Sequence, residues 1–260
     1  MTPVFRPIAQ GRVHRWGGAL LLVARCRDLR QRAGHVPLSP AERYVLRALP
    51  AWRQAEWTAG RLLAKRLVGE AVSAPAEDVE ILPRDDGSPC VVVGGSPAPA
   101  LNLSISHTAH HVAAALAPQP VGVDLCETAS ADAVRRVADR VLSPEELSLV
   151  GTERPEALAG AWALKEAAVK ADRSGVFGAA PLGVPILGLG PPVLGGARRA
   201  MVWRTDDATL ALVLATRPAE RPPADGIALV LLAPLDHSGQ RSAWPCGSRG
   251  TAAAERARAR

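Results

Sequence analysis

The 260-residue sequence predicts an α+β protein made of two similar halves. The motif Leu-Ser-Pro-Ala-Glu at 38–42 recurs as Leu-Ser-Pro-Glu-Glu at 142–146. In both copies a serine stands directly before a proline, which is typical of a helix start with serine at the N-cap. An apolar strand candidate precedes each copy, at 19–24 and at 121–125. Two such halves related by pseudosymmetry would form a cleft where they meet.

The similarity continues in a helix that follows each motif. Each helix has a tryptophan, a charged residue four positions later and a lysine eight positions later. These residues are Trp57, Arg61 and Lys65 in the first half and Trp162, Glu166 and Lys170 in the second. Internal similarity of this kind is the signature of a duplicated unit.

We therefore predict an N-terminal subdomain at 1–118 and a C-terminal subdomain at 119–236. The segment 237–260 is rich in arginine and poor in apolar residues, so we expect a disordered tail. The segment 176–196 is rich in Gly and Pro, which predicts a loop with little regular structure. The apolar run at 227–233 predicts a further strand.

Alternation of apolar and polar residues predicts the central strands. Between 101 and 107 the apolar residues Leu101, Leu103 and Ile105 lie on one face, and His107 ends the strand. Further strand candidates form two hairpins, one from 112–117 and 121–125 around Pro118-Gln119-Pro120, the other from 201–205 and 208–215 around Asp206-Asp207.

Composition excludes several classes of protein. No apolar run is long enough to span a bilayer and no N-terminal signal precedes one, so we expect a cytoplasmic protein that does not bind membranes. The four cysteines show no spacing typical of a zinc site. The net charge of +6 and the pI near 9.8 favour an anionic partner without identifying it.

Lysine is rare in this chain and two of its three lysines lie on one helix. Trp162, Lys165, Glu166, Val169 and Lys170 follow the i, i+3, i+4, i+7, i+8 spacing of one helical face. Lysine and arginine bind phosphate differently, so a compact ammonium group is needed here. An ordinary solvated face with a Glu–Lys pair would give the same pattern.

The strand at 121–125 carries a second carboxylate. Period two places Gly122, Asp124 and Cys126 on one face and Glu127 on the other. Gly122 leaves room for a bulky group to approach the strand. One carboxylate on each element, with ammonium groups beside them, is suited to a divalent metal and a phosphate-rich ligand.

Three segments in this order resemble the 4'-phosphopantetheinyl transferases of the two-subdomain, surfactin-type class. They are Asn102 to His107, Val121 to Glu127 and the block Trp-Ala-Leu-Lys-Glu-Ala-Ala-Val-Lys at 162–170. Asp-Gly-Ser-Pro at 86–89 fits the Gly-x-Pro element of that family, and the similarity covers about residues 38 to 215. The resemblance implies two pseudo-symmetric α+β subdomains with the active site at their interface.

The resemblance implies a magnesium-dependent transferase. It would move phosphopantetheine from coenzyme A to a serine of an apo acyl or peptidyl carrier protein and release adenosine 3',5'-bisphosphate. Asp124 and Glu166 would hold Mg²⁺, and Glu166 or a water that it orients would take the proton of the serine. Lys165 and Lys170 would neutralise charge on the phosphates.

Further residues are expected to bind coenzyme A. Ser106 and His107 match the phosphate-contacting Ser-His pair of the family, although a lone histidine is also a common structural residue. Gly87 and Pro89 would let the backbone approach the nucleotide, or form a plain turn. Two arginines of the first half are candidates for the 3'-phosphate, Arg53 and Arg61.

The sequence departs from the family at one position. The usual pattern is Gly-x-Asp-x-Glu, but here Cys126 stands in the place of the second acid and Glu127 follows it. A neutral thiol is a poor magnesium ligand. Either water completes the metal shell or a bulge turns Glu127 inward, and we favour water.

A non-catalytic, basic nucleic-acid-binding module is the alternative function. The high pI supports it, but aromatic residues make up only 3% of the chain and no nucleic-acid motif is present. We therefore expect no nucleic-acid partner. We also expect a monomer, because the acids and the Ser-His strand fall in different halves of the same chain.

Overall fold

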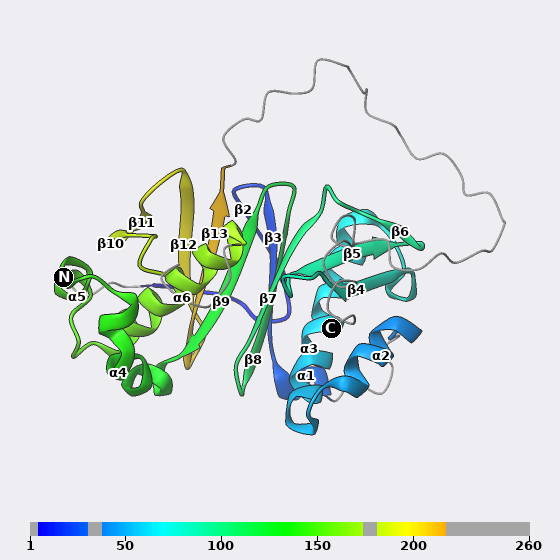
Figure 1. The fold of residues 1–260 in the computed structure, drawn as a ribbon, viewed down its shortest axis with the longest axis horizontal. Coiled ribbons are helices and arrows are strands. Elements are labelled where there is room, and N and C mark those ends of the chain that lie inside the picture. The colour runs from blue at the N-terminus through cyan, green and yellow to red at the C-terminus, as the bar shows by residue number, and fades with distance from the viewer. Residues whose placement is uncertain (1–4, 31–37, 174–180, 217–260) are drawn as a thin grey trace, which may run out of the picture.

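Two β-sheets lie face to face in the middle of the molecule, and a long helix covers the outer face of each (Figure 1). The structure is a computed structural model, and it describes residues 5–30, 38–173 and 181–216. This architecture confirms the α+β class predicted from the sequence. No helix in these ranges is both long and apolar enough to cross a membrane.

The first half has a four-stranded sheet with the strand order β2-β3-β8-β7 and a three-stranded sheet with the order β4-β5-β6. The strands are β2 (Val13–Trp16), β3 (Ala19–Arg25), β4 (Val79–Pro83), β5 (Pro89–Val93), β6 (Ser96–Pro97), β7 (Asn102–His107) and β8 (His111–Ala117). The helices are α1 (Cys26–Arg30), α2 (Pro40–Ala48) and α3 (Ala51–Val72), followed by a short 3₁₀ turn, η2 (Ala76–Asp78).

The second half has a four-stranded sheet with the order β1-β12-β13-β9 and a hairpin of β10 and β11. Its strands are β1 (Arg6–Pro7), β9 (Val121–Glu127), β10 (Ile186–Leu189), β11 (Pro192–Leu194), β12 (Arg198–Arg204) and β13 (Ala208–Ala215). Its helices are α4 (Ala131–Val141), α5 (Pro144–Val150) and α6 (Pro155–Asp172), with a 3₁₀ turn η3 (Thr128–Ser130) before α4. The N-terminal strand β1 thus joins the sheet of the second half.

The two halves share one topology. The strand order β7-β8-β3 in the first half corresponds to β12-β13-β9 in the second. In chain order, β3 and β9 come first in these sets. Each is followed by a short capped helix and a long packed helix, which are α2 and α3 after β3 and α5 and α6 after β9. The repeated Ser-Pro motif therefore marks a duplicated fold, as the sequence predicted.

Each repeated motif ends in a buried glutamate that pairs with a lysine of the long helix. Ser39 and Ser143 cap their helices as predicted, and each forms a capping box with the glutamate three residues later. Glu42 lies 2.7 Å from Lys65, and Glu146 lies 2.6 Å from Lys165.

This pairing corrects the predicted alignment of the two long helices. Lys65 corresponds to Lys165, because each pairs with the glutamate of its own motif. The sequence comparison had matched Lys65 with Lys170, which is five residues too far along α6. The tryptophan spacing misled the comparison, since Trp162 has no structural counterpart at Trp57.

Three apolar clusters hold the layers together. One lies between α3 and the first sheet and includes Leu63 and Leu67, and another lies between α6 and the second sheet and includes Leu164. The third fills the space between the two sheets and includes Leu21 of β3 and Val123 of β9. Because the sheets share this core, the boundary between the halves is a packed interface.

Gly122 allows α6 to pack directly on β9. A Cβ atom at Gly122 would lie 1.8 Å from the carbonyl oxygen of Ala167 and 2.7 Å from the amide nitrogen of Ala171. The group that approaches this glycine, as the sequence predicted, is therefore the backbone of α6. This close contact places the charged residues of α6 against β9.

We expect Gly122→Ala to lower the free energy of unfolding by about 3 kcal/mol or more, at the upper end of the cost of overpacking. The atoms that the new Cβ would clash with belong to the backbone of α6, so no side-chain rotation can relieve the clash. Urea denaturation measures the effect. Gly188→Ala on β10 is the control, because its Cβ would have no neighbour closer than 3.4 Å. Equal losses in the two variants would contradict this reading of Gly122.

Most predicted strands are present, and one prediction of loop is wrong. The strands predicted around 101–125 and 201–215 match β7, β8, β9, β12 and β13 within a few residues. The segment predicted as a loop contains the hairpin of β10 and β11, in which Ile186 pairs with Leu194. The strand predicted at 227–233 and the tail at 237–260 lie outside the described residues.

Candidate active site

Asp124 and Lys170 form an ion pair where β9 meets α6. Asp124 is only 6% exposed, and the Lys170 Nζ lies 2.5 Å from its Oδ1. The same ammonium donates to the carbonyl oxygen of Val123 at 3.3 Å. The predicted faces of β9 are confirmed, since Asp124 and Cys126 point toward α6 while Val123 and Leu125 belong to the core between the sheets.

Glu166 is the second carboxylate of this site. It is half-buried one turn before Lys170 on α6. Burial and the nearby charge of Asp124 raise its pKa, while Lys170 opposes the shift. Within the described ranges, no hydrogen bond or ion pair engages its carboxylate. The structure thus brings together the three predicted catalytic residues, Asp124, Glu166 and Lys170.

Ser106, on β7 of the first half, contacts the carboxylate of Asp124. Its hydroxyl donates to Asp124 Oδ1 at 2.8 Å and accepts from the amide of Leu125 at 3.1 Å. The predicted phosphate-contacting serine is therefore part of the seam between β7 and β9.

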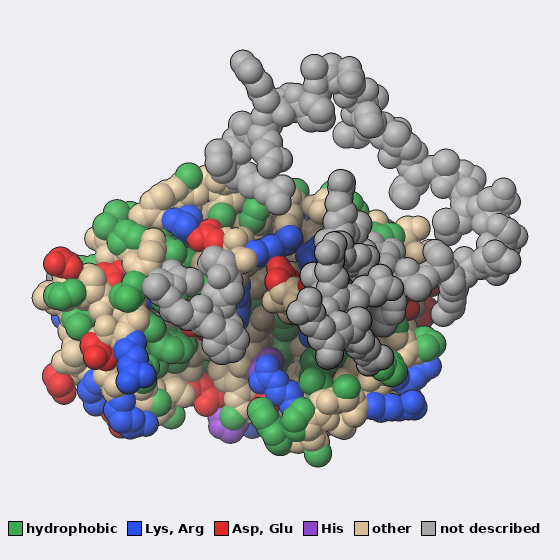
Figure 2. Space-filling model, in the orientation of Figure 1, with side chains coloured by type: hydrophobic (Ala, Val, Ile, Leu, Met, Phe, Trp, Pro, Cys, Tyr) green, Lys and Arg blue, Asp and Glu red, His purple; other side chains and the backbone are tan. Residues whose placement is uncertain are grey.

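His107 points to the other face of β7, because neighbouring residues of a strand alternate. Its Nδ1 lies 3.5 Å from Glu56 of α3. Burial lowers the pKa of His107. The charges of Glu56 and Asp124 oppose this shift, and those of Arg53 and Lys170 add to it. Sequence reasoning missed Glu56, since no motif links this residue to β7. On the face shown in Figure 2, charged side chains of both signs and histidines gather along the boundary between the halves.

Lys165 is not part of this group. Its side chain is 1% exposed and donates to Glu146 at 2.6 Å, to the Pro181 carbonyl at 3.0 Å and to the Val184 carbonyl at 2.7 Å. These three acceptors use all three donors of the ammonium group. The expectation that Lys165 neutralises phosphate charge therefore disagrees with its position. The repeated glutamate of the Ser-Pro motif was the signal that could have identified its partner.

The two candidate arginines differ in how they are held. Arg53 is exposed and lies 3.9 Å from Glu56, next to His107. Arg61 stacks on Trp57, with 4.2 Å between the guanidinium carbon and the ring centre. Its Nε is buried and has no hydrogen-bond partner among the described residues, and burial lowers the pKa of Arg61 to about 10. Arg61 therefore remains charged at neutral pH.

Gly87 and Pro89 lie at the turn between β4 and β5. Gly87 has a φ of +79°, which favours glycine, and a Cβ there would meet nothing within 4 Å. The predicted open turn is therefore present. Against the effect of burial, hydrogen bonds from Ser88 lower the pKa of Asp86 in this turn, and the charge of Arg173 at the end of α6 adds to this shift. The turn thus lies across the boundary from the helix that carries Glu166.

Glu127 does not reach the carboxylates through a bulge. β9 pairs with β13 in continuous register from Val121 to Glu127. The Glu127 Oε1 accepts from the amide of His110 at 3.0 Å, on the side of the first half. Cys126 is 5% exposed in the core under α6, where burial and the acids beside it raise its pKa to about 12. The sequence left two arrangements open, in which either water or an inward-turned Glu127 completes the metal shell. This geometry favours water.

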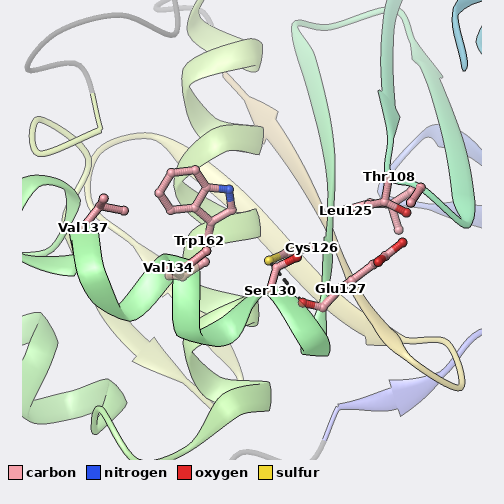
Figure 3. Close-up of a pocket in the computed structure, with 10 residues that line it drawn as sticks. Thr108, Leu125, Cys126, Glu127, Ser130, Val134, Val137 and Trp162 are labelled. Atoms are coloured by element: carbon pink, nitrogen blue, oxygen red, sulfur yellow. Dashed lines mark hydrogen bonds between the residues drawn. The ribbon is translucent and has the colours of Figure 1, made fainter. Parts of the chain in front are cut away.

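A cavity of about 540 Å³ opens beside this site. It is lined by residues of β9, α4, α6 and the turn between β7 and β8, among them Trp162, Val134, Cys126 and Glu127 (Figure 3). Trp162 precedes Glu166 by one helical turn and Cys126 follows Asp124 by two strand positions. The lining thus includes sequence neighbours of Asp124 and Glu166, but neither of these two carboxylates is among the lining residues.

The donor set fits a magnesium ion. Burial and, after it, the charge of Asp124 raise the pKa of Glu166, and a bound divalent cation would relieve the repulsion between the two carboxylates. Magnesium commonly takes one or two carboxylates and fills its remaining positions with water and phosphate oxygens. In the part of the chain that the structure describes, no group of three or more His, Cys, Asp or Glu side chains forms a denser metal site.

Two carboxylates and an ammonium group meet where β9 packs on α6, an arrangement suited to a divalent metal and a phosphate group. Residues 120–184 match the family model described as the 4'-phosphopantetheinyl transferase superfamily. This match confirms the superfamily predicted from the sequence, and with it a phosphopantetheinyl transferase. The matched segment contains Asp124, Glu166 and Lys170.

One solved structure similar to part of the chain is a holo-(acyl-carrier-protein) synthase from Bacillus anthracis str. Ames in complex with CoA (3',5'-ADP). The identity is 24% and the TM-score 0.32, over 38% of this chain and 92% of that chain. No curated protein matches the chain.

We expect Glu127→Gln to leave the magnesium requirement unchanged, because its carboxylate bonds to the first half. We expect Cys126→Glu to lower the magnesium concentration needed for half-maximal rate, because it adds a carboxylate on the face of Asp124. Titration of Mg²⁺ against initial rate compares both variants with wild type. A raised requirement in Glu127→Gln would show that this side chain turns inward when substrate binds.

Proposed function

We propose that the protein transfers the 4'-phosphopantetheine group of coenzyme A to a serine of an apo acyl or peptidyl carrier protein. The observation that carries the proposal is the convergence of Asp124, Glu166 and Lys170 within the segment that matches the superfamily.

The proposed reaction is a displacement at phosphorus. The serine oxygen of the carrier forms a bond to the phosphorus that bears pantetheine. The bond from that phosphorus to the bridging oxygen breaks, and adenosine 3',5'-bisphosphate leaves with the electron pair. Glu166 accepts the serine proton, directly or through a water that it orients.

Asp124 and Glu166 would hold Mg²⁺. When bound, the ion would neutralise charge on the pyrophosphate and orient it. Lys170 lies beside both carboxylates and would donate to a phosphate oxygen as negative charge develops there. Arg61, which stacks on Trp57, and Arg53, which lies near His107, are the candidates for the 3'-phosphate.

The cavity beside Trp162 suits the pantetheine arm. Its walls are apolar at Val134, Val137 and Trp162, with Thr108, Ser130 and Glu127 offering a few polar groups. Small-molecule sites commonly combine these features, which match an arm that alternates methylene and amide groups. The turn at Gly87 and Pro89 and the side chain of His107 lie on the first-half side, where we place the nucleotide.

We also propose that one chain forms a complete site and acts as a monomer. Ser106 and Asp124 come from different halves yet hydrogen-bond within the chain. The subdomain boundary that we propose at 118/119 lies between β8 and β9, with β1 crossing from the first segment into the second sheet.

The decisive experiment combines the protein with coenzyme A, Mg²⁺ and a panel of apo carrier proteins, and measures the intact mass of each carrier. We expect a gain of one phosphopantetheine group that disappears when magnesium is chelated. Nucleic-acid binding without transfer, weakened by salt and insensitive to chelation, would instead support the basic binding module.

The rate should fall at low pH as Glu166 becomes protonated. Burial and the charge of Asp124 raise the pKa of Glu166 in the metal-free protein, and bound Mg²⁺ would oppose this shift, so we expect the acid limb of the kcat profile to move to lower pH as Mg²⁺ is increased. Measurement of kcat from pH 4 to pH 9 at low and at saturating Mg²⁺ tests this. An acid limb that does not move with Mg²⁺ would argue against Glu166 as a base that also binds the metal.

A further inference from the structure

Two serines bridge the edge strands of the two sheets. β7 is the last strand of the first-half sheet, and β9 is the last strand of the second-half sheet. The amides of Val123 and Leu125 on β9 donate to side chains of β7. Ser104 Oγ accepts from Val123 at 3.0 Å, and Ser106 Oγ accepts from Leu125 at 3.1 Å.

The two serines differ in one hydrogen bond. Both are buried, at 4% and 5% exposure, and both satisfy an amide of β9 that has no strand partner. Only Ser106 also donates its proton, to Asp124 Oδ1 at 2.8 Å. A hydroxyl has a single proton, so this bond uses the donor capacity of Ser106. The hydroxyl therefore cannot donate to a phosphate at the same time.

Both donors to Asp124 reach the same oxygen. Ser106 approaches Oδ1 from the first half, and Lys170 approaches it from α6 at 2.5 Å. Within the described ranges, no hydrogen bond reaches Oδ2. Two donors from different elements fix the plane of the carboxylate and leave Oδ2 as the oxygen that a cation would take.

We propose that Ser106 is a positioning residue that sets the orientation of Asp124 for metal binding, rather than a phosphate ligand. This inference rests on the proposed function, because it assigns the metal to Asp124. The hydrogen bond from Ser106 to Asp124 would then have two roles, because it joins the two halves and also orients the carboxylate of Asp124. Hydrogen-bond partners of a metal-binding carboxylate commonly change metal affinity or activity by about 10- to 100-fold when they are removed.

The test compares Ser106→Ala with Ser104→Ala in the full chain. Each variant leaves one buried amide of β9 without an acceptor, so we expect similar shifts of the urea midpoint. Only Ser106→Ala should raise the magnesium concentration for half-maximal rate, by about tenfold. The KM for coenzyme A should change little. In an Asp124→Asn background, Ser106→Ala should cause no further change in rate.

A second readout does not depend on turnover. Mg²⁺ is titrated against thermal stability in the presence of adenosine 3',5'-bisphosphate, and the half-saturating concentration should rise for Ser106→Ala alone. If both serine variants show the wild-type magnesium requirement, the positioning role is wrong and the proposed function stands. If wild type shows neither magnesium-dependent transfer nor magnesium-dependent stabilisation, the proposed function fails and the inference fails with it.

Discussion

Asp124→Ala is expected to lower the rate of carrier modification by at least ~100-fold, because metal positioning depends on this carboxylate. Glu166→Ala should cause a loss of similar size, since the base is removed together with a metal ligand. Initial rates at saturating coenzyme A and Mg²⁺ measure both effects. The fold should survive in Asp124→Ala, because the side chain of Lys170 is 25% exposed and can be hydrated when its partner is removed.

Glu156→Ala is the matched control for this pair of variants. Glu156 is an exposed acid in the first turn of the same helix, away from Asp124. It should leave the rate within a factor of two of wild type, which is the scale expected for a surface substitution. Near-normal turnover in Asp124→Ala or Glu166→Ala would remove that residue from the site.

Lys165→Met is expected to lower the free energy of unfolding by about 3–5 kcal/mol, the usual cost of breaking a buried ion pair. It would leave the buried carboxylate of Glu146 without its partner, and Glu146 also accepts from the amide of Ile186. Urea denaturation measures the loss. Because the side chain makes no contact with Asp124, the surviving folded protein should retain most of its activity.

Lys170→Met provides the opposite pattern. Its partner Asp124 is buried but keeps the hydrogen bond from Ser106, so Lys170→Met should cost less stability than Lys165→Met and should lower kcat strongly. If Lys165→Met instead raised the KM for coenzyme A without loss of stability, the original assignment of Lys165 to the phosphates would be correct. The two lysines therefore separate a structural role from a catalytic one on the same helix.

Sequence periodicity predicted β9 well but could not orient α6. On a strand, period two fixes the face of every residue once one face is buried, so the placement of Asp124 followed directly. The helix is apolar nearly all round, and Lys165 and Glu166 are neighbours on it. Spacing alone does not show which of the two points inward. Only the buried partner of Lys165, which comes from α5, resolves the question.

Other parts of the site depend on contacts that are distant in sequence. Glu56 reaches His107 across 51 positions, and Ser106 reaches Asp124 across 18. A single sequence contains no signal for such pairs, although it correctly marked Ser106, His107 and Asp124 one by one. The hairpin of β10 and β11 was missed for a different reason, since its Gly and Pro residues obscure the alternation that marks a strand.

The duplication has a consequence for the number of active sites. β3 corresponds to β9, and counting back from the pairs Ala24–Val112 and Cys126–Thr209 places Leu22 in the position of Asp124. Leu22 is fully buried against α3, so the first copy has an apolar contact where the second has its acid. Of the two halves, only the second carries an acid at this position. We therefore expect the protein to bind one coenzyme A per chain.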